Sequence, residues 1–219
     1  MNKSIVLGLE TSGIVCSVAW WQNGETLLEY NIERENAHAA ILAGLIKKGH
    51  KALAIDSSAV ALLAVGSGPG SFTGLRIGMS FAKGFCMGRN IPLVAVTNFN
   101  VLAEFATEIS KPVYTLIEAR HAMYYTGVFS HKNGELTKKY LADKKELVSE
   151  IPEEAQIIVH EEKNKGAFRQ ILSPDRRLVQ GAYKSSIICA IGQRIFEQQA
   201  APALDDIEPL YVQAFAGVL

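Results

Sequence analysis

The chain has 219 residues, and its 22 lysine and arginine residues are balanced by 22 aspartate and glutamate residues. This neutral balance argues against independent nucleic-acid binding, which normally leaves a basic footprint. The longest uninterrupted apolar run, residues 59–65, is too short to cross a bilayer, and no signal peptide is visible. The three cysteines lie far apart without paired spacing, which favours buried thiols in a reducing compartment over a disulfide framework or a zinc site. We therefore expect a soluble, cytoplasmic protein without membrane contact.

The start of the chain predicts an antiparallel meander followed by a helix. Apolar runs favour strands over residues 4–9, 15–21 and 26–32, and Asn23-Gly24 is a strong hairpin signal. A helix is expected over residues 36–48. It carries no charged side chain before residue 47, whereas a helix with a water-facing side usually has lysine and glutamate there. We therefore expect this helix to be covered on two sides.

A glycine-rich loop joins the next strand to the next helix. Residues 60–65 predict a buried strand, residues 66–70 contain three glycines, and residues 73–87 predict a helix capped by Ser71 or Thr73. Each glycine inside a helix costs about 0.5–1 kcal/mol relative to alanine. This helix nevertheless has glycine at positions 74, 78, 84 and 88. We therefore expect another backbone to approach it closely, either from this chain or from a second chain.

The strand pattern then starts again. A strand over residues 92–96 and a helix over residues 97–109 complete the first pass, and strands over residues 112–117, 123–129 and 136–141 open a second pass. We interpret this recurrence as an internal duplication of one unit.

Two details recur at matching places in both passes. A glutamate ends the first strand of each pass, at Glu10 and at Glu118. An Asn-Gly-Glu turn follows in each pass, at residues 23–25 and 133–135. The alternative to a duplication is a coincidence between two hairpins.

The duplication predicts two lobes, residues 1–110 and residues 111–219. The second lobe is thinner, because after its meander only residues 156–160 and 177–180 favour strands and residues 184–199 favour an amphipathic helix. This C-terminal segment can pack back on the first lobe.

The glycine-rich loop is a candidate anion site. Loops of this kind bind anions because free N–H groups and the helix dipole point at the ligand, so Gly66, Gly68, Gly70 and Ser71 form a candidate phosphate loop. The Lys-Ser/Thr pair of a Walker A motif is missing. A tight strand-to-helix turn with close packing is the interpretation that we prefer.

The two glutamates that end strands are the other candidates for chemistry. In a duplicated, two-lobed fold Glu10 and Glu118 would face one cleft, where paired carboxylates could hold a metal-bound phosphate. The alternative is that both are turn acids. The five histidines show no i, i+4 pair, so no metal site is expected. Ser71 is not in a G-x-S-x-G elbow, so a serine hydrolase is poorly supported.

The run from Val65 to Gly78, VGSGPGSFTGLRIG, resembles the signature of the TsaB (YeaZ) family. The opening LGLETS followed by VCSVA, the Glu118-Ala119-Arg120 segment and the closing Pro209-x-Tyr211-Val212 fit the same family. The resemblance is dense over about residues 4–100 and sparse over residues 130–200.

This resemblance implies an α/β chain with a duplicated actin-like ATPase fold (ASKHA, ribonuclease H-like), in two lobes with a reduced second lobe. It implies a non-catalytic scaffold subunit that pairs with TsaD and recruits the ATPase TsaE. The complex makes threonylcarbamoyladenosine on the adenosine 3′ of the anticodon in tRNAs reading ANN codons. The resemblance further implies that the chain meets tRNA only through the complex, pairs with itself when alone and needs no cofactor.

The two nearly uncharged helices are the pairing surface that this resemblance implies. Small side chains there would let helices of two chains approach closely. The expected interface residues are Ala40, Ala43, Gly44, Gly74, Ile77, Gly78, Phe81 and Ala82.

Two alternative functions compete with the scaffold. One is a nucleotide-binding enzyme of the same fold that uses Glu10 and Glu118 with Mg and ATP. The family usually has aspartate at these two positions and arginine at Gln213, which weakens this alternative. The other is a peptidase, an older label for relatives of this fold, but no nucleophile–base pair in the sequence supports it.

Overall fold

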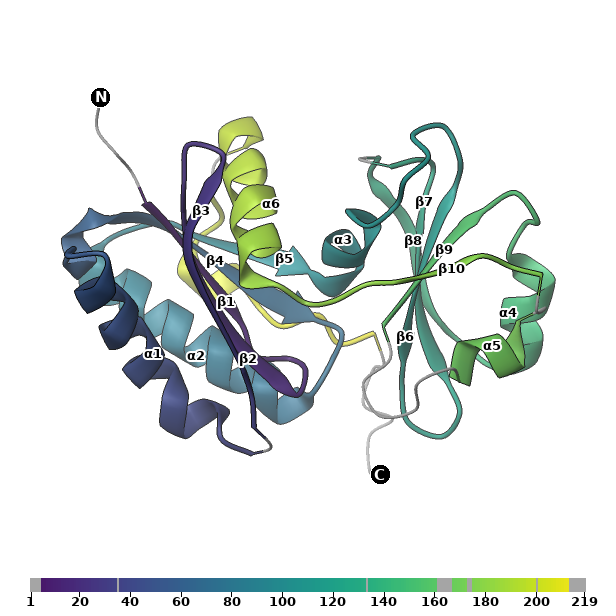
Figure 1. Ribbon diagram of the computed structural model, residues 1–219, viewed down its shortest axis with the longest axis horizontal. Coiled ribbons are helices and arrows are strands. Elements are labelled where there is room, and N and C mark those ends of the chain that lie inside the picture. The colour runs from purple at the N-terminus through teal and green to yellow at the C-terminus, as the bar shows by residue number, and fades with distance from the viewer. Residues whose placement is uncertain are drawn as a thin grey trace. The chain divides into compact units, whose positions relative to one another are not determined.

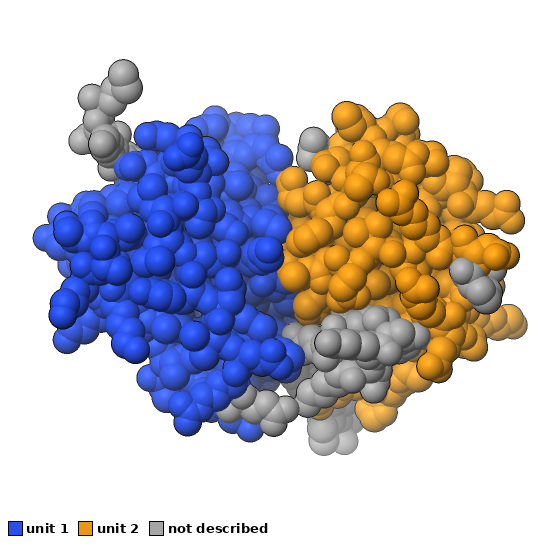
Figure 2. Space-filling model, in the orientation of Figure 1, with its two compact units in different colours: residues 1–98, 183–209 blue, residues 99–182, 210–219 orange. Residues whose placement is uncertain are grey.

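The computed structural model describes residues 5–34, 36–132, 134–160, 167–172, 175–199 and 201–212. The chain forms two compact units (Figures 1 and 2). Unit 1 consists of residues 1–98 and 183–209, and unit 2 consists of residues 99–182 and 210–219. Each unit contains one five-stranded mixed sheet.

The sheet of unit 1 has the strand order β3-β2-β1-β4-β5. Its strands β1, β2 and β3 form the predicted antiparallel meander, and β4 and β5 continue the sheet in parallel to β1. Asn23 and Gly24 make the predicted hairpin turn, with φ values of 53° and 87°. The strands are β1 (Ile5–Glu10), β2 (Val15–Gln22), β3 (Glu25–Glu33), β4 (Val60–Gly68) and β5 (Leu93–Thr97).

The two faces of this sheet carry side chains of different size. Side chains alternate between the faces of a strand, and large apolar side chains such as Leu7, Trp20 and Leu63 belong to one core cluster with α1 (His38–Ala52) and α2 (Phe72–Arg89). The opposite face packs against α6 (Ser185–Gln198) and has Gly8 and Ala64 at the points of closest approach. Figure 1 shows α1 and α2 together on one side of the sheet and α6 on the other.

Close contacts explain why the face toward α6 has small residues. A Cβ added to Gly8 would lie 2.4 Å from the backbone oxygen of Ser185, and a Cβ on Gly192 of α6 would lie 2.5 Å from Cβ of Ala64. The first turn of α6 is held by the same sheet, because Ser17 Oγ accepts a hydrogen bond from Ser185 N at 3.1 Å. Glu29 Oε1 accepts another from Ser186 N at 2.9 Å. The helix dipole also stabilises a carboxylate at the N-terminus of a helix.

Helix α2 sits on the turn between β1 and β2. Ser71 is its N-cap, as predicted, and accepts a hydrogen bond from Gly74 N at 3.2 Å. A Cβ on Gly74 would lie 2.0 Å from Thr11 O, and one on Gly78 would lie 2.3 Å from Thr11 Oγ1. By contrast, a Cβ on Gly84 or Gly88 would meet nothing within 4 Å. Two of the four helix glycines therefore face Thr11 of the same chain, Gly74 its backbone and Gly78 its side chain, and the other two face outward.

Unit 2 repeats the topology of unit 1. Its sheet order, β10-β9-β6-β7-β8, places the strands in the same sequential arrangement, with an antiparallel meander and two further parallel strands. The predicted duplication is confirmed. The strands are β6 (Val113–Glu118), β7 (Tyr124–Phe129), β8 (Leu136–Ala142), β9 (Gln156–His160) and β10 (Leu178–Gln180).

The helices between the strands of unit 2 are short. Helix α4 (Lys144–Glu150) and helix α5 (Ala167–Ile171) occupy the places that α1 and α2 occupy in unit 1. They have 7 and 5 residues, against 15 and 18, so the second lobe is reduced as expected. Sequence reasoning missed both helices, although the Asp143-x-x-Glu146 capping box of α4 is visible in the sequence.

The last helix of each pass does not belong to the unit that contains the strands before it. Helix α3 (Asn98–Ala103) follows β5, yet its residues 99–103 belong to unit 2, where a Cβ on Gly127 would lie 2.7 Å from the Phe99 ring. Helix α6 follows β10 but belongs to unit 1. The unit boundary therefore falls at residues 98 and 99 instead of 110 and 111, and residues 183–209 lie in unit 1.

Two further elements complete the described chain. Short 3-10 helices occur at Ser57–Ala59 and Leu204–Asp206. Among the described helices, none is long and apolar enough to cross a membrane.

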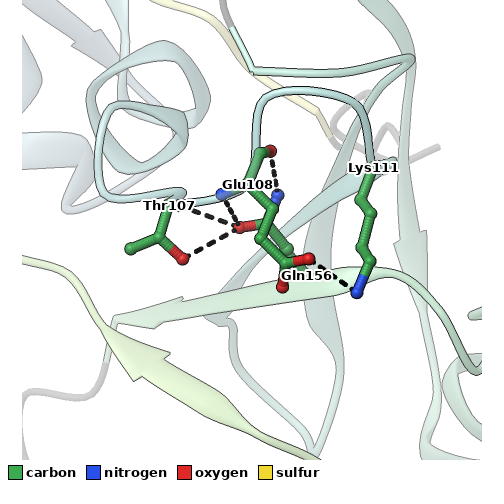
Figure 3. Close-up of polar contacts among 4 residues, drawn as sticks. All are labelled: Thr107, Glu108, Lys111 and Gln156. Atoms are coloured by element: carbon green, nitrogen blue, oxygen red, sulfur yellow. Dashed lines mark hydrogen bonds and ion pairs between the residues drawn. The ribbon is translucent and has the colours of Figure 1, made fainter.

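The Gln156 side chain holds the segment that follows α3 in unit 2 (Figure 3). Its Oε1 accepts hydrogen bonds from Thr107 N and Glu108 N, both at 2.8 Å, and its Nε2 donates to Glu108 O at 2.6 Å. A side-chain amide thus binds the backbone of this segment. Helix α3 ends at residue 103 instead of the expected 109. The nearby ion pair between Lys111 and Glu108, at 2.7 Å, is about half exposed and contributes little.

The contrast between the inward and outward glycines of α2 gives a first prediction. Gly74→Ala is expected to lower the free energy of unfolding by about 1–3 kcal/mol, because the new methyl group overpacks against Thr11 O. Gly84→Ala, in the same helix, is expected to raise it by about 0.5–1 kcal/mol, because alanine is the better helix former. Urea unfolding measures both, and equal effects of the two substitutions would contradict this packing.

The Gln156 contacts give a second prediction. Gln156→Leu is expected to cost about 1–3 kcal/mol of unfolding free energy, because the partly buried backbone groups of Thr107 and Glu108 lose their partners. Lys111→Ala removes only the exposed ion pair and serves as the control, with a change within about 0.5 kcal/mol. Thermal and urea unfolding followed by circular dichroism measure the difference, and a Gln156→Leu variant as stable as Lys111→Ala would refute the role.

Candidate functional site

The outward side of α1 and α2 is an exposed surface built mainly from small residues. The two helices contact each other and lie side by side over the sheet of unit 1 (Figure 1). Residues three or four apart share one side of a helix, and the exposed side chains follow this spacing. We call this surface the outer face and define it by Ala40, Ala43, Gly44, Ser80, Gly84, Met87 and Gly88, all exposed.

Only part of the predicted interface lies on the outer face. Ala40, Ala43 and Gly44 are exposed on α1, as that prediction requires. Ile77 and Phe81 are half-buried and pack against the core of unit 1.

Three predicted interface residues of α2 are instead buried inside the chain. Ala82 is fully buried, and Gly74 and Gly78 are closed off by Thr11. Their assignment to a surface was wrong, because this side of the helix packs on the sheet.

The outward residues of α2 were missed in the predicted interface. Ser80, Gly84 and Gly88 are spaced by four, as Gly74, Gly78 and Ala82 are, so spacing alone does not tell the two sides apart. The large apolar residues Leu75 and Met79, both buried, mark the side toward the sheet. Met87 is 70% exposed and adds a large apolar side chain to the outer face.

The charges on the two helices are all positive. Helix α1 contains Lys47, Lys48 and Lys51, helix α2 contains Arg76, Lys83 and Arg89, and neither helix contains aspartate or glutamate. Five of these six cations are exposed, and Lys83 is half-buried. The guanidinium of Arg76 lies over the Phe72 ring, 3.8 Å from its centroid.

The glycine-rich loop is tied to the turn that follows β1. Strand β4 continues through Gly68, further than the predicted end at residue 65. Ser71 N donates to Ser12 O at 2.7 Å, and Thr11 Oγ1 donates to Gly74 O at 2.8 Å. Gly68 has a φ of 97°, which favours glycine.

A buried asparagine binds this loop to the turn that follows β1. Asn98 is fully buried, and its Nδ2 donates to Ser12 Oγ at 2.6 Å and to Pro69 O at 2.9 Å. Together with Ser71, which caps α2, these contacts bind the loop to groups of its own chain. The geometry favours the structural interpretation of Gly66, Gly68, Gly70 and Ser71, and their role as a phosphate loop stays a prediction.

Glu10 and Glu118 occupy equivalent ends of β1 and β6. Glu10 is fully buried, its Oε1 accepts a hydrogen bond from Ser12 N, and a Cβ on Gly66 would collide with its Oε2. Glu118 is half-buried, and its charge adds to the effect of burial in raising the pKa of Tyr124. The two carboxylates lie in different units, so a shared nucleotide site stays a prediction.

The three cysteines are buried free thiols, as predicted. Burial raises the pKa of Cys16 to about 11, with a further contribution from the charge of Glu10, and raises the pKa of Cys86 to about 12. The pKa of Cys189 is also raised, first by burial and then by Glu29. These thiols stay protonated at neutral pH, which is typical of structural cysteines.

The surface of unit 2 has an open depression of about 700 Å³ that includes none of the predicted site residues. It is lined by residues of the β6–β7 turn and of α4, among them His121, Met123, Lys144 and Val148. His121 has a positive φ of 59°.

A family model described as TsaD, tRNA N6-adenosine threonylcarbamoyltransferase, matches residues 32–193. The chain is also 31% identical to the tRNA threonylcarbamoyladenosine biosynthesis protein TsaB of Haemophilus influenzae over 135 residues, which are 60% of this chain and 57% of that protein. It is 26% identical to TsaB of Bacillus subtilis over 129 residues, 59% of this chain and 56% of that protein. The matched part thus spans just over half the length of these relatives.

The fold is also found in a solved structure. YeaZ from Pseudomonas aeruginosa superposes with a TM-score of 0.80 over 95% of this chain and 99% of that chain, at 22% sequence identity. This likeness and the repeated sheet topology confirm the expected duplicated α/β fold. The chain therefore belongs to the family of the TsaD model, and within it the chain is similar to the curated TsaB proteins of Haemophilus influenzae and Bacillus subtilis.

Proposed function

We propose that this protein is a non-catalytic scaffold subunit that pairs with a TsaD-like protein in the synthesis of threonylcarbamoyladenosine on tRNA. The names of the related proteins support the pathway, and the match to the TsaD family model supports descent from a common fold with the partner. The outer face of α1 and α2 is the observation that carries the pairing role.

The outer face has the properties of a helix-packing surface. Small residues at Ala40, Ala43, Gly44, Gly84 and Gly88 let helices of another chain approach closely, since interaxial distances depend on the side chains at the contact. An exposed Met87 at one end offers an adaptable apolar contact. An ordinary solvated helix face would carry both lysine and glutamate instead.

The contacts of the glycine-rich loop support a role without catalysis by this chain. Ser71 Oγ serves as the helix cap, and the Glu10 carboxylate is engaged by Ser12 N beside Gly66. The cysteine thiols are protonated and buried. The scaffold role requires no cofactor of its own.

The wider assembly follows the TsaB resemblance. We propose that a TsaE-like ATPase joins the pair and that the product is modified at the adenosine 3′ of the anticodon in tRNAs reading ANN codons. The chain would meet tRNA only through the complex, in the cytoplasm, where tRNA is used.

Pairing is tested with two matched substitutions of alanine by leucine. Ala43→Leu lies on the outer face, while Ala190→Leu lies on an exposed position of α6. Ala43→Leu is expected to weaken binding to the TsaD-like protein of the same organism by about tenfold or more, because overpacking costs about 1–3 kcal/mol. Ala190→Leu is expected to bind like the unchanged chain. Sedimentation velocity of the mixed proteins measures both.

The outcomes separate the proposal from its main alternative. No complex between the unchanged proteins at micromolar concentration would reject the scaffold role. Stoichiometric binding of Mg-ATP by the isolated chain, lost in Glu10→Ala, would then favour the nucleotide-binding enzyme.

A further inference from the structure

We infer that the open depression on unit 2 binds an extended protein segment that carries an apolar side chain next to carboxylates. We call this surface the unit 2 depression. It lies between the β6–β7 turn and α4 and includes no residue of the outer face. The inference therefore goes beyond the pairing function and follows from the lining, the charges and the openness of the depression.

The lining of the unit 2 depression is mainly apolar. Helix α4 buries Leu147 in the core of unit 2, whereas the next residue, Val148, is 53% exposed and lines the depression. The other described residues of α4 that are exposed are lysine, glutamate and serine. Across from α4, the turn contributes an exposed Ala122 and a half-buried Met123. A partner that covers these side chains therefore removes apolar surface from water.

The turn presents its side chains at a conformational cost. Met123 N donates to Arg120 O at 3.2 Å, and the two residues between them, His121 and Ala122, have φ values of 59° and 55°. Asn-Gly is the usual pair at two such positions in a hairpin, because the left-handed region disfavours residues with a larger side chain. Glycine at Ala122 would relieve this cost and would also remove an apolar group from the depression.

The charges of the lining leave two lysines available to a partner. Three charged residues line the depression, Asp143, Lys144 and Lys145. Asp143 is used by the capping box, because its Oδ1 accepts from Glu146 N and Glu146 Oε2 accepts from Asp143 N, both at 2.9 Å. Lys144 Nζ donates to the carbonyl oxygen of Gln170 at 3.4 Å. Neither lysine forms an ion pair with another described residue.

Helix stability does not account for these two lysines. They are the first two residues of α4, and its last turn contains no basic residue. The helix dipole favours acidic side chains in the first turn and basic side chains in the last turn. Lys144 and Lys145 therefore lie at the unfavourable end of their helix. A carboxylate of a partner beside them would offset this repulsion.

The shape and chemistry together favour a protein segment as the occupant. Small-molecule sites enclose most of the ligand surface, whereas this depression is open, so a chain that continues beyond it gains further contacts. The apolar lining at Met123 and Val148 favours an apolar side chain over the phosphates of a nucleic acid. The lysines beside it favour carboxylates and disfavour a basic segment.

The test measures binding of short fluorescein-labelled peptides to the full chain by fluorescence anisotropy. In one peptide Leu and Phe alternate with Glu, and in the other Lys replaces each Glu. The acidic peptide is expected to bind about tenfold or more tightly than the basic peptide at about 50 mM NaCl. Lys144→Glu with Lys145→Glu is expected to weaken binding of the acidic peptide about tenfold or more. Val148→Ser is expected to weaken it several-fold, because the apolar contact is lost.

A matched control is available on α1. Lys47 and Lys48 are also neighbouring exposed lysines of a helix, but they lie in unit 1. Lys47→Glu with Lys48→Glu changes the net charge equally and is expected to leave binding of the acidic peptide unchanged. Circular dichroism melts check that each variant is folded. In the ¹⁵N-labelled chain, the acidic peptide is expected to shift amide resonances of residues 119–123 and 143–149.

The remaining outcomes would overturn the inference. No binding of the acidic peptide, or equal weakening by the two lysine-pair variants, would show that the depression does not select it. Tighter binding of tRNA, abolished by Lys144→Glu with Lys145→Glu, would assign the lysines to nucleic acid. Benzoate that shifts the same resonances, with no binding of the peptide, would assign the depression to a small carboxylate. Pairing with the TsaD-like protein enters none of these measurements, so the scaffold role stands or falls separately.

Discussion

The two unlike faces of the unit 1 sheet determine the rest of the structure. Large side chains such as Leu7 and Trp20 fill the space under α1 and α2, while Gly8 and Ala64 leave room for the close approach of α6. A helix that approaches so closely needs partners for its first N–H groups, and β2 and β3 supply them. With one face of the sheet closed by α6 and the other by α1 and α2, the outward side of α1 and α2 is left for another molecule.

The last helix of each pass also packs where a sheet has a glycine. Each pass ends in a helix that packs on the sheet of the other unit, α3 through Phe99 on Gly127 and α6 through Ser185 on Gly8. In both cases a glycine on the sheet admits the helix. Neither unit is therefore built from one continuous stretch of chain. Because α4 and α5 are short, the two long helices that lie side by side, α1 and α2, are those of unit 1. The outer face is on their outward side.

Sequence reasoning succeeded where local patterns decide the structure. Turn chemistry at Asn23-Gly24 and apolar periodicity predicted both meanders, the strand–loop–helix at residues 60–88 and the helix α6. It failed where a distant contact is involved: residues 104–109 were expected to continue α3, whereas the Gln156 side chain binds the backbone of Thr107 and Glu108. It also chose the wrong row of α2 as the interface, since the rows starting at Gly74 and Ser80 have equal spacing, and the contacts with Thr11 and the buried Leu75 and Met79 show which row faces inward.

The central claim is that α1 and α2 form the surface that binds a TsaD-like partner. Hydrogen–deuterium exchange of the full chain, with and without the TsaD-like protein of the same organism, tests it most directly. The account predicts that the partner slows exchange over residues 38–52 and 72–89 and leaves unit 2 nearly unchanged. Protection confined to α6 or to unit 2, with both helices unaffected, would contradict the claim.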